Sequence, residues 1–238
     1  MDQNEWEQLS KRQEQLHPDL AEYLMETPCG LMVNHPLVQW PSVDREYAAN
    51  VNWSYSQKLD AVAKAIEKRN WSSYISLHER PYRLEAFIEI YDTLSPKGFW
   101  TLLSDVWTDS ENTWQHLADW RALWNDDRPG KHYAMDASER QAFKCLPSEI
   151  VLYRGIRECH TVNGMSWSLD RAKAIWFATR RGGNPVLLTA RAKKADAHAL
   201  LLGRVGFYAV AWAAKFNAGA TVWRGGLFIF LSLQIAIT

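Results

Sequence analysis

The order of apolar and polar positions changes character near residue 147. Before it, apolar residues recur every three or four positions among charged ones, a period that predicts amphipathic helices. We expect one such helix over Asn4 to about Met25, with a break or kink at Pro18. Another is expected over residues 57–69, with Ser56 as its N-cap. The first 147 residues are therefore predicted to form a helical module.

Proline, glycine and capping residues mark where these elements begin and end. Pro96 is expected in the first turn of a helix, where its missing N–H costs little. Residues 27–53 contain several such breaking residues and are expected to be rich in loops. Asp136 followed three residues later by Glu139 matches a capping box, which predicts a last short helix that ends at Leu146.

Tryptophans are concentrated in the second half of the helical module. Five of them fall at or near helical spacing: Trp100, Trp107, Trp114, Trp120 and Trp124. One interpretation is a tryptophan-rich core, because aromatic stripes usually bury their area inside the fold. The other interpretation is an exposed face that binds a partner protein.

The pattern after residue 148 is different. Residues 149–156 form a compact run of β-branched and aromatic residues, which predicts a strand. A helix over residues 169–181 is expected next, with Ser168 as its N-cap, and a second strand over residues 185–192. The whole chain is accordingly predicted to be an α+β protein, a helical N-terminal module followed by a mixed α/β module.

The last part of the chain, residues 205–238, has no clean period of either 2 or 3.6. The apolar run from Leu227 to Thr238 is shorter than the roughly 20 residues that a helix needs to cross a bilayer. We therefore expect no membrane partner, and the run is interpreted as a buried strand or as an unstructured apolar tail.

The charges are divided unevenly between the two modules. The chain holds 27 basic and 27 acidic residues, and 47% of its residues are hydrophobic, which excludes general disorder. Residues 1–148 hold 15 basic against 23 acidic side chains, a balance of −8, and residues 149–238 hold 12 against 4, a balance of +8. A cationic module favours an anionic ligand, and we expect the acidic helices to pack beside it because no Gly/Ser-rich spacer separates the two.

Cysteine usage and the start of the chain bear on its compartment. The three cysteines are widely separated and have no CxxC spacing, so neither a disulfide framework nor a metal site is expected. The first residues lack the basic-then-apolar pattern of a signal peptide, which predicts a cytoplasmic protein. His160 and His198 have no second ligand at a suitable spacing and are taken as ordinary histidines.

Two short motifs in the basic module carry candidate chemistry. Arg154 follows Tyr153 in the predicted strand and precedes Gly155, which would let a ligand approach the backbone. Arginine suits such a place because its planar guanidinium binds phosphate oxygens through two parallel hydrogen bonds. Ser166 and Ser168 alternate with apolar residues, so in an extended segment both hydroxyls would point to one side and could bind a ribose.

These motifs together resemble the Arg-Ser-Glu class of ADP-ribosyltransferases, the cholera-toxin-like family found in bacterial toxins and phage proteins. The resemblance runs from about Glu149 to Arg204. It implies that Arg154 holds the phosphates of NAD, and that Ser166 and Ser168 shape the pocket for the nicotinamide ribose. It also implies an ADP-ribosyltransferase-like module over residues 148–204 and transfer of ADP-ribose to a macromolecular target protein.

The third motif of that family, a Glu-x-Glu or Gln-x-Glu on a later strand, is missing. No Asp or Glu follows Asp196, so the catalytic residue is unknown. Three interpretations are open: a frameshift near Arg204 that replaces the end of the module, a diverged and inactive homologue, or a coincidental resemblance.

Two functions from different classes follow from these observations. The first is an NAD-dependent mono-ADP-ribosyltransferase-like protein of weak or absent activity. The alternative is a non-catalytic interaction protein that acts through its tryptophan-rich helices. Nucleic acid is not expected as a partner, because the basic residues are not interleaved with an aromatic module of known type.

Overall fold

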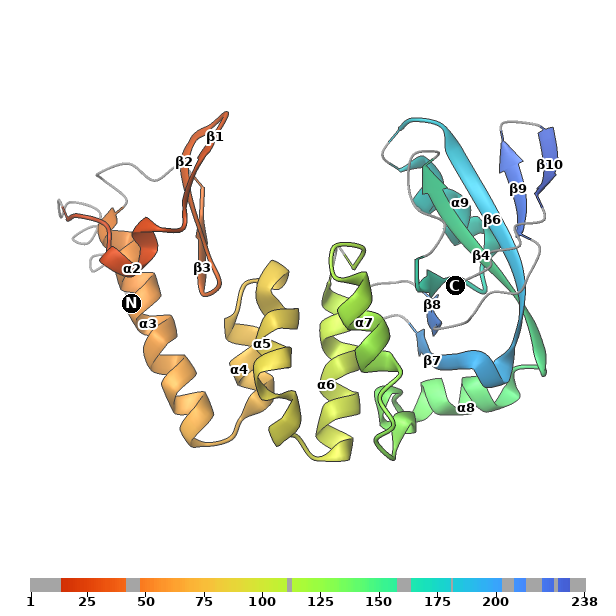
Figure 1. Ribbon diagram of the computed structural model, residues 1–238, viewed down its shortest axis with the longest axis horizontal. Helices are drawn as coiled ribbons and strands as arrows, with labels where there is room; N and C mark the ends of the chain where they lie inside the picture. Colours follow the sequence, from red (N-terminus) through yellow and green to blue (C-terminus); the bar gives the residue numbers. More distant parts are fainter. Residues whose placement is uncertain are drawn as a thin grey trace. The chain divides into compact units, whose positions relative to one another are not determined.

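The computed structural model describes residues 14–41, 48–110, 113–157, 164–180 and 182–202, together with the backbone of three further strands. These strands are β8 (Tyr208–Trp212), β9 (Ala220–Arg224) and β10 (Leu227–Leu231). The chain combines helices with antiparallel sheets and belongs to the α+β class, as predicted (Figure 1).

The chain divides into two compact units. Unit 1 comprises Met1–Leu94 with Asp109–Glu111, and unit 2 comprises Ser95–Thr108 with Asn112–Thr238. The boundary expected from the sequence, at residue 147, is not a boundary between these units. The helices that follow Ser95 share one compact unit with the basic module.

Unit 1 begins with a short helix and a three-stranded antiparallel meander. The elements are α2 (Pro18–Ala21), β1 (Leu24–Thr27), β2 (Gly30–His35) and β3 (Val38–Trp40), in the sheet order β1-β2-β3. Over the described part of residues 27–53, strands and the start of a helix replace the expected loops; residues 42–47 lie outside the described residues. The helix expected over Asn4–Met25 is replaced by α2 and β1 where it is described, and its first ten residues lie outside the described part of the chain. Pro28 and Pro36 lie in the two tight hairpin turns, and Gly30 begins β2 directly after the first turn. At the first turn the hydroxyl of Thr27 donates to the carbonyl of Gly30, which has a positive φ of 115°.

The rest of unit 1 is helical. It contains α3 (Ala48–Glu67), α4 (Trp71–Leu77) and α5 (Arg83–Ile90), joined by the 3₁₀ turns η1 (Arg80–Tyr82) and η2 (Tyr91–Thr93). Helix α3 starts eight residues before Ser56, so Ser56 lies inside the helix and is not its N-cap. The meander packs against α2 and α3 through one apolar cluster of buried residues: Leu20, Val33, Leu37, Val38, Val51 and Tyr55.

The first half of unit 2 is helical and built around tryptophans. It contains α6 (Pro96–Asp109), whose last residue is counted with unit 1, α7 (Leu117–Trp124), the 3₁₀ turn η3 (Lys131–Ala134) and α8 (Ala137–Cys145). Pro96 begins α6, and Asp136 and Glu139 form the capping box of α8, both as predicted. Four of the five tryptophans are at most 4% exposed, whereas Trp114 is 65% exposed. The interpretation of a tryptophan-rich core is confirmed for Trp100, Trp107, Trp120 and Trp124.

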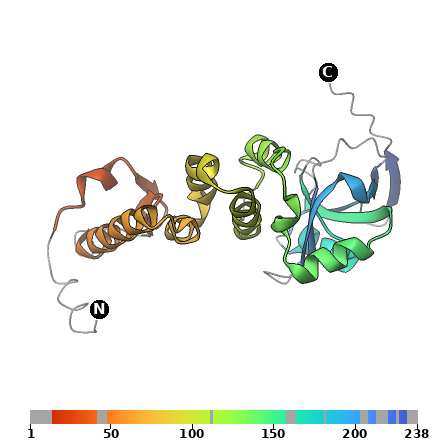
Figure 2. The same ribbon diagram turned by 90° about the horizontal axis from the view of Figure 1, so that it is seen from below.

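The second half of unit 2 contains two antiparallel sheets. The elements with described side chains are β4 (Glu149–Arg157), β5 (Ser166–Trp167), α9 (Arg171–Thr179), β6 (Pro185–Lys193), η4 (Lys194–Asp196) and β7 (Ala197–Leu202). One sheet has the order β10-β9-β6-β4 and the other has the order β5-β8-β7. Helix α9 packs on β4 and β6, and helix α8 lies beside the strands of this unit (Figure 2).

The predicted strands are confirmed as β4 and β6, but one other expectation needs correction. Asp170, not Ser168, is the N-cap of α9, because its side chain accepts from the backbone N–H groups of Ala172 and Lys173. Of the two interpretations of the last apolar run, the strand agrees with β10 over Leu227–Leu231. In the same part of the chain, β8 pairs with β5 and β7, and β9 pairs with β6. Each of the two sheets thus contains at least one strand from residues 205–238.

The helices after Ser95 are attached to the basic module by a buried side chain. Oε1 of Glu139, in the first turn of α8, accepts a hydrogen bond of 2.7 Å from the backbone N–H of Leu202 on β7. The contact expected between the acidic helices and the basic module is therefore present within unit 2. Over the described residues, no helix is long and apolar enough to cross a membrane.

Candidate functional site

The candidate site is built where the two sheets of unit 2 meet. Tyr153 on β4 and Ser168, just after β5, exchange two backbone hydrogen bonds of 2.8 and 2.7 Å. This bridge holds the segment with the two serines beside the strand that carries Arg154. The sequence motifs that were singled out separately are thus brought together by tertiary pairing.

Arg154 makes the central contact of this site. Its Nη1 donates a hydrogen bond of 2.6 Å to the carbonyl oxygen of Ser166. The residue is half-buried, and its Nε is fully buried without a hydrogen-bond partner among the described residues. Burial lowers the pKa of the guanidinium to about 10, so Arg154 keeps its positive charge at neutral pH. Among the described residues, no carboxylate forms an ion pair with Arg154.

The two serines of the motif have different surroundings. Ser166 is half-buried in β5 and accepts the bond from Arg154 through its backbone. Ser168 is buried, and its hydroxyl accepts a 3.0 Å hydrogen bond from the N–H of Asp170. Its hydroxyl therefore helps to form the turn into α9, just before the true N-cap.

Glycines allow the close packing around Arg154. A Cβ added to Gly164 would overlap the guanidinium of Arg154, so the backbone at Gly164 lies directly against the charged group. A Cβ added to Gly155 would overlap the carbonyl oxygen of Ala174 and would lie 2.6 Å from the backbone nitrogen of Ala178. Gly155 thus lets helix α9 approach β4, and the structure gives it a packing role in place of the expected approach of a ligand.

Sequence reasoning missed a second group of polar side chains in unit 2, around His198 on β7. The imidazole stacks on the ring of Trp124, with centroids 5.8 Å apart, and its Nδ1 lies 3.5 Å from Nζ of Lys131. Burial, and to a smaller extent Lys131, lower the pKa of His198 to about 4. Sequence spacing holds no signal for this group, because its members come from α7, η3 and β7.

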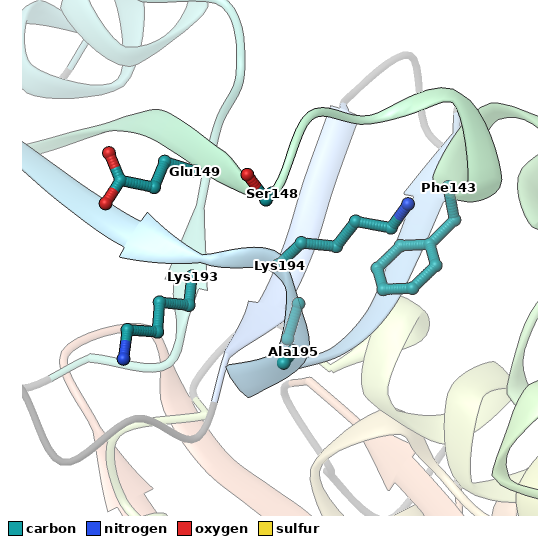
Figure 3. Close-up of a pocket in the computed structure, with 7 residues that line it drawn as sticks. Phe143, Ser148, Glu149, Lys193, Lys194 and Ala195 are labelled. Atoms are coloured by element: carbon teal, nitrogen blue, oxygen red, sulfur yellow. The ribbon is translucent and has the colours of Figure 1, made fainter.

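Neither an open surface hollow nor a metal cluster offers a better site. The hollow in Figure 3 is lined by residues that include Phe143, Glu149 and Lys194. Nζ of Lys194 donates to the carbonyls of Lys144 and Leu146 at 2.8 and 3.0 Å, so it caps the C-terminal end of α8. Within the described ranges, no group of His, Cys, Asp and Glu could hold a metal ion.

Comparisons of the chain with protein-family models, with curated proteins and with solved structures found no match. The residues around Arg154 are therefore the basis for a proposed function.

Proposed function

We propose that the protein is an ADP-ribosyltransferase-like NAD-binding protein with little or no transferase activity. One observation carries the proposal: the guanidinium of Arg154 bonds to the Ser166 carbonyl, with a buried Nε that has no partner among the described residues. Removing a charged group from water without a counter-charge costs free energy, and an anion bound beside it would lower that cost. The diphosphate of NAD is such an anion.

The sequence resemblance supplies the substrate class for this cation. In the proposed complex Arg154 contacts the diphosphate, and the Ser166–Ser168 segment contacts the nicotinamide ribose. Because Nη1 of Arg154 already bonds to Ser166, the same arginine would link the phosphate contact to the position of the serine segment. We also propose that the protein is cytoplasmic and that the acceptor of ADP-ribose is a macromolecule.

Transfer itself needs a further group. Cleavage of the bond between nicotinamide and ribose develops positive charge on the sugar, and a preorganised carboxylate is the group that stabilises it. No Asp or Glu follows Asp196. We therefore expect purified protein to bind NAD but to release nicotinamide at a rate close to that of NAD alone. Robust nicotinamide release that is absent from Arg154→Met would contradict the proposed lack of activity.

NAD binding is tested by calorimetry with matched variants of two arginines. Arg154→Met keeps most of the side-chain volume but removes the charge, and we expect it to weaken NAD binding by about 1.5 to 3 kcal/mol, the scale of a charge-assisted hydrogen bond. Arg180→Met is the control, because the Arg180 guanidinium lies over the rings of Trp176 and Phe177 at the end of α9. Equal losses in both variants would indicate a diffuse basic surface, and no binding by the unchanged protein would refute the proposed function.

The alternative function, a non-catalytic interaction through the tryptophan-rich helices, would rest on Trp114 among the five tryptophans, because this residue is 65% exposed. Trp100, Trp107, Trp120 and Trp124 are buried in the core and are not available to a partner.

A further inference from the structure

A separate feature of unit 1 is the turn that joins β2 to β3. His35 pairs with Val38 across this hairpin, so Pro36 and Leu37 form a two-residue turn. The favoured two-residue hairpin turns need a positive φ at their first residue, which proline cannot adopt. Neither Pro36 nor Leu37 has a positive φ. The stability of this turn therefore depends on hydrogen bonds that are not part of the hairpin ladder.

Two such hydrogen bonds meet at the turn. Nδ1 of His35 accepts a bond of 3.0 Å from the backbone N–H of Leu37. The N–H of Glu79 donates to the carbonyl of Pro36 at 2.7 Å. Of these two bonds, the one to His35 depends on a side chain that titrates near neutral pH. Leu37 belongs to the buried apolar cluster of unit 1, so this bond also fixes a residue of the core.

The bond to Leu37 determines the protonation state of His35 in this structure. A backbone N–H can only donate, so Nδ1 must be the unprotonated nitrogen of a neutral imidazole. When the imidazole gains a proton, both ring nitrogens become donors, and Nδ1 no longer accepts. The N–H of Leu37 then loses its acceptor.

The groups packed around His35 give the protonated form little compensation. The imidazole makes edge-to-face contacts with the rings of Tyr23 and Tyr55, with centroids 4.5 and 4.9 Å apart. Burial lowers the pKa of His35, the carboxylate of Asp19 opposes that shift, and His78 adds to it. Asp19 is exposed and already accepts a 3.1 Å hydrogen bond from the hydroxyl of Tyr55, so it is a weak counter-charge for His35.

Two other sets of titratable groups lie near the turn. The ring of His17 contacts Tyr55 at a centroid distance of 5.1 Å, and its Nδ1 lies 3.7 Å from a carboxylate oxygen of Asp19. Lys58 and Glu79 form an ion pair with an N···O distance of 2.6 Å, so their charges compensate each other. Neither set supplies an uncompensated negative charge for a protonated His35.

We propose that the turn between β2 and β3 is a pH-sensitive switch in unit 1. In its closed form, neutral His35 accepts from the N–H of Leu37. Protonation of His35 removes this bond, opens the turn and frees Leu37 from the apolar cluster. Because the folded-state pKa of His35 is lowered, its contribution to stability is complete above the ordinary value of 6.5 and is lost as the pH falls below it. The switch lies in unit 1 and does not depend on NAD binding by unit 2.

The test measures hydrogen exchange of the Leu37 amide in the full chain by NMR at about pH 7.5 and about pH 5. Each rate is compared with that of His35→Asn at the same pH, because asparagine accepts from the N–H two residues further on, as in an Asx turn, but does not titrate. At about pH 7.5 we expect rates equal to within about twofold. At about pH 5 the unchanged protein should exchange at least about fivefold faster, since its open form takes up a proton more readily than its closed form. Equal rates at the lower pH would overturn the proposal.

Two control variants locate the effect. His17→Asn removes the other histidine on Tyr55 and keeps a side-chain acceptor for the N–H of Asp19, which donates to Nδ1 of His17 at 3.3 Å. His198→Phe removes an imidazole of unit 2. Both variants should keep the faster exchange of Leu37 at about pH 5. Loss of the effect in His17→Asn, or in His198→Phe, would assign it to another histidine and overturn the proposal.

A measurement on the unchanged protein makes the test independent of how well His35→Asn folds. The nitrogen chemical shifts of the His35 ring report which nitrogen carries a proton. We expect Nδ1 to be unprotonated at about pH 7.5 and to gain its proton over the pH range in which the exchange of Leu37 accelerates. A protonated Nδ1 at about pH 7.5, or protonation without a change at Leu37, would refute the switch.

Discussion

Glu139 on α8 and Arg154 on β4 are charged side chains of opposite sign inside the same unit, and their surroundings differ. Glu139 is fully buried, and its two carboxylate oxygens accept from the backbone N–H groups of Asp136 and Leu202, each at 2.7 Å. Burial raises the pKa of Glu139, and the two backbone donors oppose that shift. Arg154 has one carbonyl partner and a buried Nε with none among the described residues.

The difference separates a structural charge from a candidate ligand-binding charge. A buried carboxylate whose oxygens are satisfied by backbone donors of two elements joins those elements and has no further need of a partner. In contrast, a guanidinium that faces only a carbonyl gains from any anion that reaches it. Glu139 is thus assigned to the joint between α8 and β7, although a glutamate is the residue type that the family motif lacks.

The largest expected effect concerns the Glu139 joint. Glu139→Ala leaves the N–H groups of Asp136 and Leu202 without their acceptor, so we expect a loss of about 2 to 4 kcal/mol in the free energy of unfolding, measured by denaturant titration. Glu139→Gln keeps one carbonyl oxygen and should lose roughly half as much. If alanine cost less than about 0.5 kcal/mol, the joint would not stabilise the unit.

A smaller effect is expected for His198, the half-buried imidazole on β7 whose Nε2 is buried. Its folded-state pKa of about 4 lies below the ordinary value of 6.5. Folding therefore favours the neutral imidazole, and this contribution is complete above the unfolded pKa and is lost as the pH falls through 6.5 toward 4. Between about pH 7 and about pH 5 we expect the stability to fall by about 1 to 2 kcal/mol more in the unchanged protein than in His198→Phe. Parallel pH curves for the two proteins would contradict the neutral state of the His198 imidazole in the folded protein.

The smallest expected effect on stability is that of Arg154→Met. Arg154 is half-buried and has no ion-pair partner among the described residues, and replacing such a charge by an apolar side chain of similar volume is often neutral or stabilising. The free energy of unfolding should therefore change by less than about 1 kcal/mol in either direction. The NAD affinity of the same variant should fall, as described above. A loss of stability as large as that of Glu139→Ala would assign Arg154 to the structure of the unit and would remove the contrast between the two charges.

Sequence signals that involve only neighbouring residues were sufficient to predict several helices and strands. The capping box of Asp136 and Glu139, the start of α6 at Pro96 and the strands β4 and β6 were all predicted. The capping box, however, did not reveal that the same carboxylate reaches Leu202, 63 residues away. The proline and glycine signals over residues 27–53 were detected correctly, but a turn between strands and a loop carry the same residues.

The sequence by itself determined the α+β class, the burial of most tryptophans and the two motifs around Arg154 and Ser166. Periodicity, capping and turn chemistry depend on neighbouring residues, and these are visible in the sequence. Only the tertiary structure decided that the guanidinium of Arg154 bonds to Ser166, that α9 occupies the space beside Gly155, and that β8 and β9 enter the two sheets. Strand pairing and close helix–strand approach join residues far apart in the chain, and their register depends on the packing of the whole unit.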